Sequence, residues 1–248
     1  KYNYDGKEKT PEVYLDDVMG TTLKEGTDYQ VEYESDRIKP GKYNVKITLM
    51  GDYEGEETIK FSILPGKISK ITAVQNTSAV KLTWTKSVGT TGYRVFRYNP
   101  STKSWIVAVK STKDNTALIQ NLTPGTKYIF AVRPYYNTGK EIIWANYTQI
   151  QTATRTAAPS IRLASTAKGR ATIAWNDVNG ETGYQIYYST KASSGYTKLS
   201  NYNANVTKAY KTGLVSGRTY YFRVRTYIKT TSGYVYSSFS PVKSMKIK

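Results

Sequence analysis

The chain has 248 residues, of which 39% are hydrophobic and 13% aromatic, with 24 Tyr against 5 Phe and 4 Trp. It contains no Cys and no His, which excludes disulfides, Cys- or His-ligated metal sites and nucleophile–His pairs. The net charge of +18 is uneven, because residues 1–64 carry 9 Lys/Arg and 14 Asp/Glu, whereas residues 65–248 carry 27 Lys/Arg and 4 Asp/Glu. The length predicts two or three domains, an acidic one followed by basic ones.

The first 64 residues predict a small β module. Apolar and polar residues alternate over 29–33, 43–49 and 59–63, the period of strands with one solvated face. The motifs of this segment resemble a small bacterial immunoglobulin-like repeat. That family has another strand before Tyr4, and only three residues precede Tyr4 here, so we expect residues 1–64 to lack this edge strand. The motifs are Tyr4-Asp-Gly-Lys7, Gly26-Thr-Asp-Tyr29, Gly41-Lys-Tyr43, Gly51-Asp-Tyr-Glu-Gly55 and Phe61-Ser-Ile63.

The rest of the chain contains an internal repeat. Four motifs recur at offsets of 91 or 92 residues, which indicates two domains of similar length. Period-two alternation and turn signals within each copy predict antiparallel strands and no helix. The motif pairs are 80–84 with 171–175, 92–95 with 183–186, 122–128 with 214–220, and 144–147 with 236–239.

Each copy resembles the fibronectin type III family. The resemblance rests on an early-strand Trp, on Gly-Tyr-x-Val or Gly-Tyr-x-Ile, and on Leu-x-x-Gly-x-x-Tyr. It implies a seven-stranded sandwich of two sheets with Trp84 and Trp175 in the cores. It also implies that Tyr128 and Tyr220 each donate a hydroxyl hydrogen bond to the backbone of the preceding connection.

We therefore predict an all-β chain of three antiparallel modules in series. They are the immunoglobulin-like module (1–64), the first fibronectin type III repeat (65–155) and the second (156–248). The joints at 64–67 and 154–159 are short and not Gly/Ser-rich, so we expect limited bending. Strands of about eight residues span roughly 27 Å, so three modules in line would reach on the order of 100 Å.

The sequence predicts neither an enzyme nor a cofactor. Residues 65–248 hold only the carboxylates Asp114, Glu141, Asp177 and Glu181, and the last two are expected in a solvated loop. The acidic residues 52–57 match no calcium loop and predict a surface charge run. We expect no catalytic, cofactor or metal residues.

A basic aromatic sheet face is the candidate binding surface. Its residues alternate with the predicted core on two strands that neighbour each other in this fold, so they face outward together. Aromatic rings with guanidinium groups could stack on sugars or hold anionic polymers, whereas the alternative is cross-strand pairing that only stabilises the sheet. Trp105, near a sheet edge, is a further candidate platform. The face comprises Arg94, Phe96, Tyr98, Lys127, Arg133 and Tyr135 in the first repeat, and Tyr187, Tyr221, Arg223, Arg225 and Tyr227 in the second.

Two functions follow as expectations. The first is a non-catalytic spacer in a secreted or cell-wall-associated protein, whose partners are the other domains of the same protein. The second is a binding module for carbohydrate or an anionic polymer, with Arg223 and Arg225 contributing more than distant lysines. We expect neither membrane insertion nor a nucleic-acid partner.

Overall fold

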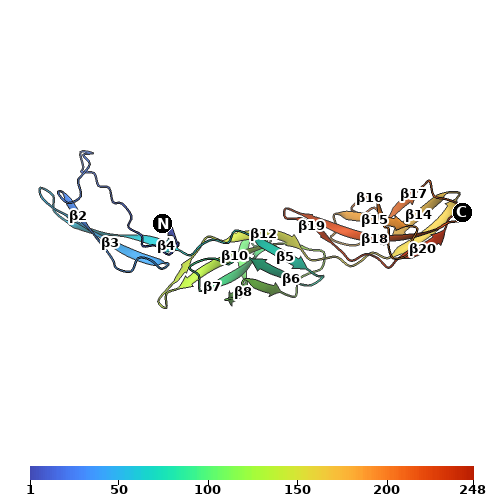
Figure 1. The fold of residues 1–248 in the computed structure, drawn as a ribbon, viewed down its shortest axis with the longest axis horizontal. Coiled ribbons are helices and arrows are strands. Elements are labelled where there is room, and N and C mark those ends of the chain that lie inside the picture. The colour runs from blue at the N-terminus through green and yellow to red at the C-terminus, as the bar shows by residue number, and fades with distance from the viewer. The chain divides into compact units, whose positions relative to one another are not determined.

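The computed structural model describes residues 1–248 and consists of strands and irregular segments (Figure 1). Twenty strands form five sheets, so the chain is all-β as predicted. No segment forms a helix that could cross a membrane.

Residues 1–64 form one four-stranded sheet of order β1-β4-β3-β2. It consists of β1 (Tyr2–Asn3), β2 (Tyr29–Tyr33), β3 (Gly41–Leu49) and β4 (Glu56–Leu64). The three alternating segments of the sequence lie in β2, β3 and β4. β1 runs parallel to β4, with Tyr2 opposite Ile63, so the prediction of a purely antiparallel module is wrong at this edge. A long connection follows β1 in place of a hairpin. Two neighbouring strands can be parallel only when the chain between them is long.

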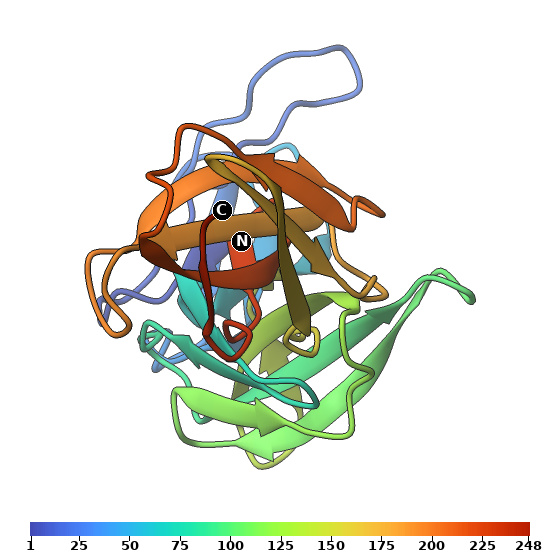
Figure 2. The same ribbon diagram turned by 90° about the vertical axis from the view of Figure 1, so that its right-hand side faces the viewer.

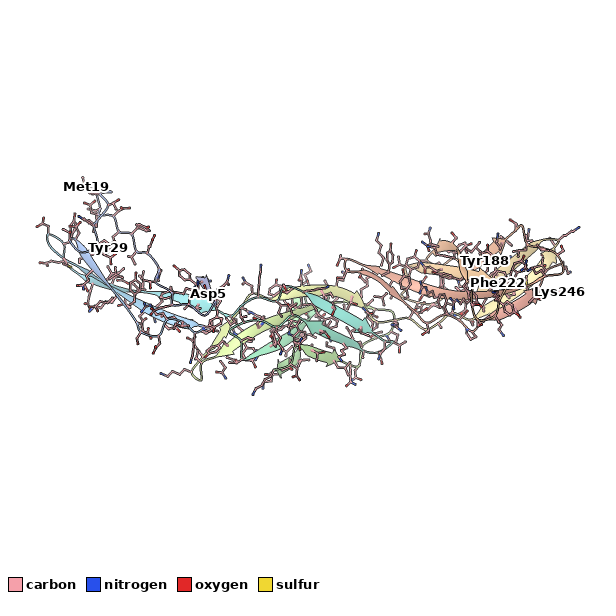
Figure 3. The ribbon with its side chains drawn as sticks, viewed as in Figure 1. Asp5, Met19, Tyr29, Tyr188, Phe222 and Lys246 are labelled. Atoms are coloured by element: carbon pink, nitrogen blue, oxygen red, sulfur yellow. The ribbon has the colours of Figure 1, made fainter.

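The segment between β1 and β2 leaves the sheet as a long loop (Figures 1 and 2). Met19 lies at its far end and is 86% exposed (Figure 3). Closer to the sheet, the Tyr29 hydroxyl donates to the Val13 carbonyl at 2.8 Å. Leu23, Tyr29 and Ile47 form one small buried cluster, and Val45, Phe61 and Ile63 form another.

The first repeat contains a three-stranded sheet, β5-β6-β9, and a five-stranded sheet, β11-β10-β7-β8 with β12 on β10. Alternation again explains the burial, since Val80, Leu82 and Trp84 of β6 are buried. Trp84 is 2% exposed and meets Tyr93 edge to face at a centroid distance of 5.3 Å. The strands are β5 (Ile71–Gln75), β6 (Val80–Trp84), β7 (Gly92–Asn99), β8 (Ser104–Thr112), β9 (Thr116–Ile119), β10 (Lys127–Asn137), β11 (Ile142–Trp144) and β12 (Thr148–Ala153).

The second repeat has the same arrangement, with sheets β13-β14-β17 and β16-β15-β18-β19, and β20 on β18. Its core joins Trp175 and Ile173 of one sheet to Tyr184, Phe222 and other residues of the second sheet. Tyr188 and Phe222 stack at 6.3 Å (Figure 3). The strands are β13 (Ile161–Ala167), β14 (Arg170–Trp175), β15 (Gly183–Ser189), β16 (Thr197–Asn203), β17 (Lys208–Lys211), β18 (Thr219–Thr230), β19 (Gly233–Tyr236) and β20 (Lys243–Lys246).

Each repeat has eight strands rather than the predicted seven, because the last strand is divided. Between β19 and β20, the hydroxyls of Ser237 and Ser240 accept hydrogen bonds from the N–H groups of Thr226 and Val224, at 3.0 and 3.1 Å. Side-chain oxygens therefore replace part of the backbone ladder there, and regular pairing is interrupted.

The hydroxyls of Tyr128 and Tyr220 bond to the backbone of the preceding connection, as expected, but in these bonds each hydroxyl accepts where it was expected to donate. The Tyr128 hydroxyl accepts from the Thr123 N–H at 2.9 Å, and the Tyr220 hydroxyl accepts from the Val215 N–H at 3.2 Å. The connection before each strand supplies a free N–H five residues upstream, so acceptance satisfies a backbone donor.

Two compact units divide the chain. One comprises Lys1–Ile71, Thr83–Ala117 and Ala131–Gln149, and the other comprises Thr72–Leu82, Leu118–Phe130 and Ile150–Lys248. This division passes through the first repeat, so domain boundaries at the two linkers remain a prediction.

Candidate functional site: two basic aromatic sheet faces

The outward face of the second repeat is set by the register of β15 against β18. Tyr187 lies opposite Arg223, and Gln185 lies opposite Arg225. Their strand neighbours Ile186 and Val224 are fully buried in the core. Since side chains alternate between the two sides of a sheet, Gln185, Tyr187, Arg223 and Arg225 share the other face.

Arg223 is held between aromatic rings on this face. Its guanidinium carbon lies 4.0 Å from the ring centroid of Tyr196 and 4.0 Å from that of Phe239. Its Nε is buried and has no hydrogen-bond partner. Stacking on two rings is therefore the main interaction of this cation, which suits the planar, weakly hydrated guanidinium.

Arg225 continues the stack and is also hydrogen-bonded. Its guanidinium carbon lies 3.9 Å from the Tyr236 centroid and 4.8 Å from that of Phe239. Its Nε donates to Gln185 Oε1 at 2.9 Å, and Nη2 donates to the Tyr187 hydroxyl at 3.3 Å. Tyr196, Arg223, Phe239, Arg225 and Tyr236 thus alternate ring and cation, and we call these five residues the ring–cation stack.

The other predicted residues of this face lie beside the stack. Tyr227 meets Tyr234 edge to face at 5.7 Å, and Tyr221 is half-buried opposite Ser189. Burial raises the pKa of Tyr196, while the positive charge of Arg223 opposes that rise. Tyr196 therefore stays a neutral ring at neutral pH, as a cation–π partner should be.

The outward face of the first repeat is built differently. Arg94 and Arg133 both lie over the ring of Trp144, with guanidinium carbons 4.8 and 5.0 Å from its centroid. Arg133 Nε donates to the Ala145 carbonyl at 2.8 Å, and burial lowers the pKa of Arg133. Tyr135 packs against Trp144 at 5.4 Å, and its hydroxyl lies 2.6 Å from Ser111 Oγ. Trp144 is therefore a packing residue held by two cations.

The same face contains a small hollow of about 170 Å³, lined by Phe96, Trp105, Ala131, Arg133 and Tyr147. Trp105 is 36% exposed and Tyr147 is 53% exposed. Their ring centroids are 5.9 Å apart, and Tyr98 packs edge to face on Trp105 at 5.4 Å. Lys127, at the start of β10, is exposed and does not line the hollow.

Three of the four carboxylates of the two repeats are occupied by structural partners. Asp177 accepts from the Tyr184 hydroxyl at 2.8 Å, Glu181 accepts from the Asn205 N–H at 3.1 Å, and Glu141 pairs with Lys42 at 2.5 Å. Burial, with the bond to Asp177, raises the pKa of Tyr184. No three carboxylates gather where they could hold a metal ion.

A larger hollow of about 740 Å³ lies in residues 1–64, apart from the predicted face. The loop residues Glu12–Val18 form one side, and Ile47, Leu49 and Ile59 of β3 and β4 form the other. It is a mainly apolar gap between the long loop and the sheet.

Sequence reasoning did not assign Gln185, Tyr196, Tyr236 or Phe239 to the face. The repeat offset could have identified the three aromatic residues. Trp144–Tyr147 and Tyr236–Phe239 are one of the repeated motif pairs, and Trp105 and Tyr196 are also 91 residues apart. What the sequence did not supply was the path of the chain between β19 and β20, which brings Phe239 back over β18.

Comparison with known protein families gave one match. Residues 65–151 match the family model of the fibronectin type III domain. Comparison with curated protein sequences gave no match.

Two solved structures are similar at low sequence identity. One is a two-domain fibronectin type III segment from chicken tenascin, with 16% identity, a TM-score of 0.43, and coverage of 73% of this chain and 98% of that one. The other is the FN1–FN3 segment of chicken CNTN1, with 16% identity, a TM-score of 0.42, and coverage of 86% and 80%. By this family match, residues 65–151 are similar to the fibronectin type III domain, a type of module that is generally non-catalytic.

Proposed function

We propose that this chain is a non-catalytic spacer of a secreted or cell-surface bacterial protein, composed of modules at 1–64, 65–155 and 156–248. It holds other domains of the same protein away from the envelope or presents them to a substrate. The observation that carries the proposal is the ring–cation stack. Arg223 and Arg225 lie on the outward face, yet their guanidinium groups are engaged by the repeat's own rings. Such a surface stabilises a sheet rather than presenting charge to a ligand.

The short linkers support the same proposal. The Gly66 N–H donates to the Val88 carbonyl at 2.9 Å, and a Cβ at Gly66 would lie 2.9 Å from Val88 Cγ2. The first linker is therefore anchored to its neighbouring loop, as a stiff joint requires.

Small-angle X-ray scattering of the full chain tests the spacer. A series of three modules should give a maximum dimension on the order of 100 Å that changes little between low and high salt. A compact particle, or a dimension that varies strongly with salt, would contradict the proposal. The salt series matters because residues 1–64 and 65–248 have opposite net charge and would attract each other if the joints were free.

A second candidate function, ligand binding, is favoured by one observation only. The hollow of the first repeat has exposed ring walls that no side chain of the repeat fills.

A further inference from the structure

The hollow and the ring–cation stack occupy equivalent positions in the two repeats. The offsets of 91 and 92 residues align Phe96 with Tyr187, Trp105 with Tyr196, Arg133 with Arg225 and Tyr147 with Phe239. Four of the five residues that line the hollow therefore have a counterpart of the same chemical kind. The fifth is Ala131, which aligns with Arg223.

This one difference explains why the hollow exists. In the second repeat the guanidinium of Arg223 occupies the space between Tyr196 and Phe239, 4.0 Å from each centroid. In the first repeat Ala131 ends at Cβ, and the space beside Trp105 and Tyr147 is left open. The second repeat thus shows that this position accepts a flat group stacked on rings.

A second cation does not suit the open position. Arg133 already lines it, Arg94 lies on the same face, and residues 65–155 carry 13 Lys/Arg against 2 Asp/Glu, a net charge of +11. Arg223 tolerates such surroundings because the chain holds it there, whereas a free cation would be repelled on approach.

A sugar ring suits the position better. The C–H groups of a pyranose can rest on the negative faces of Trp105 and Tyr147. Arg133 uses Nε for the Ala145 carbonyl, and its terminal nitrogens make no hydrogen bond within the chain, so they can donate to a hydroxyl or carboxylate oxygen. The size of the hollow, about 170 Å³, matches one small ring rather than an extended ligand.

We propose that the hollow lined by Phe96, Trp105, Ala131, Arg133 and Tyr147 binds a single pyranose ring of a glycan. Trp105 and Tyr147 stack on the ring, and Arg133 donates to one of its oxygens. The second repeat lacks this site because Arg223 fills it. The site does not depend on the spacer proposal, since a stiff or a flexible chain would carry it equally.

The test is an NMR titration of the full chain that follows the four indole N–H signals. The probes are chitotetraose as a neutral glycan, a hyaluronan tetrasaccharide as an acidic one, and arginine methyl ester as a cation. We expect a glycan to shift the Trp105 signal and to leave those of the core residues Trp84 and Trp175 unchanged.

The decisive variant is Ala131→Arg, which gives the first repeat the side chain found in the second. Binding should weaken by roughly tenfold or more. Unchanged Trp84 and Trp175 signals show that the variant is folded. Tyr147→Leu, which removes the other stacking ring and keeps the Trp105 signal, is the second variant should Ala131→Arg unfold. Arg223→Ala is the matched control in the other repeat, and it should leave the response of Trp105 intact.

Salt distinguishes the two kinds of glycan. Binding of a neutral ring should be nearly independent of ionic strength, whereas binding of an acidic ring should weaken as salt screens its attraction to Arg133. Either result supports the site. Three results would overturn it: no shift of Trp105 with either tetrasaccharide, equal binding by Ala131→Arg, or a Trp105 shift with arginine methyl ester alone.

Discussion

The outward faces of the two repeats differ in which strand carries their second arginine. In the second repeat both guanidinium groups come from β18, and Arg223 fills the space between Tyr196 and Phe239. In the first repeat one comes from β10 and the other from β7, and Arg94 and Arg133 share the single ring of Trp144. Each face has two arginines, but moving one of them between strands leaves one face closed and the other with an open hollow.

An aromatic and basic composition therefore does not define a binding surface. What matters is whether the rings and cations satisfy one another. The net charge of each repeat is strongly positive, yet the arginines nearest the centre of each face are engaged by rings of their own repeat.

Substitutions in the cores should have the largest effect, and they test whether the two repeats have equivalent cores. Trp84→Ala and Trp175→Ala should each lower the free energy of unfolding by about 3–5 kcal/mol, because each removes a buried indole and leaves a cavity. Chemical denaturation followed by circular dichroism measures this loss. A cost below about 1 kcal/mol for either variant would mean that the two tryptophans are not equivalent core residues.

An intermediate effect is expected from the arginines that the two repeats share. Arg225→Ala should cost about 2 kcal/mol, because it removes stacking on Tyr236 and Phe239 together with the bond to Gln185. Arg133→Ala should cost only about 1 kcal/mol, since it loses one ring contact and one hydrogen bond. Thermal or urea unfolding measures both.

Arg225→Lys is the control for this pair of variants. It keeps the charge but loses the planar stacking surface, so most of the loss should remain. Full stability in Arg225→Lys would show that charge alone matters and would remove the distinction between the two faces.

The smallest expected effect concerns anionic polymers. From sequence alone, Arg223 and Arg225 were expected to contribute more to such binding than distant lysines. The stacking of Arg223 reverses that order, and we now expect Arg223→Ala to weaken heparin binding no more than Lys191→Ala, whose side chain is exposed. A salt titration by fluorescence anisotropy measures this, because the Debye length shrinks from about 10 Å at 0.1 M to about 3 Å at 1 M. A clearly larger loss for Arg223→Ala would restore the sequence-based view of the face.

Local patterns in the sequence determined the strands and the two-fold repetition. Alternation placed β2, β3, β4, β6, β10 and β18, because the period of a strand is a property of the backbone and needs no tertiary partner. The constant offset of the motifs, together with Trp84 and Trp175, predicted the shared fold of the two repeats.

Other features depended on the tertiary structure. The parallel pairing of β1 with β4, the division of the last strand at Ser237–Ser240, and the accepting role of Tyr128 and Tyr220 all depend on which backbone groups come together in space. The same holds for the site. In the sequence, Phe239 is 16 residues from Arg223 and Tyr196 is 27 residues from it, so no local pattern shows which ring meets which cation. The alternation of residues along the strands is enough to predict that rings and arginines share one face of each repeat. That Arg223 fills the space between the rings in the second repeat, and that Ala131 leaves the equivalent space open in the first, depends on the distances between side chains from separate strands, which no sequence pattern contains.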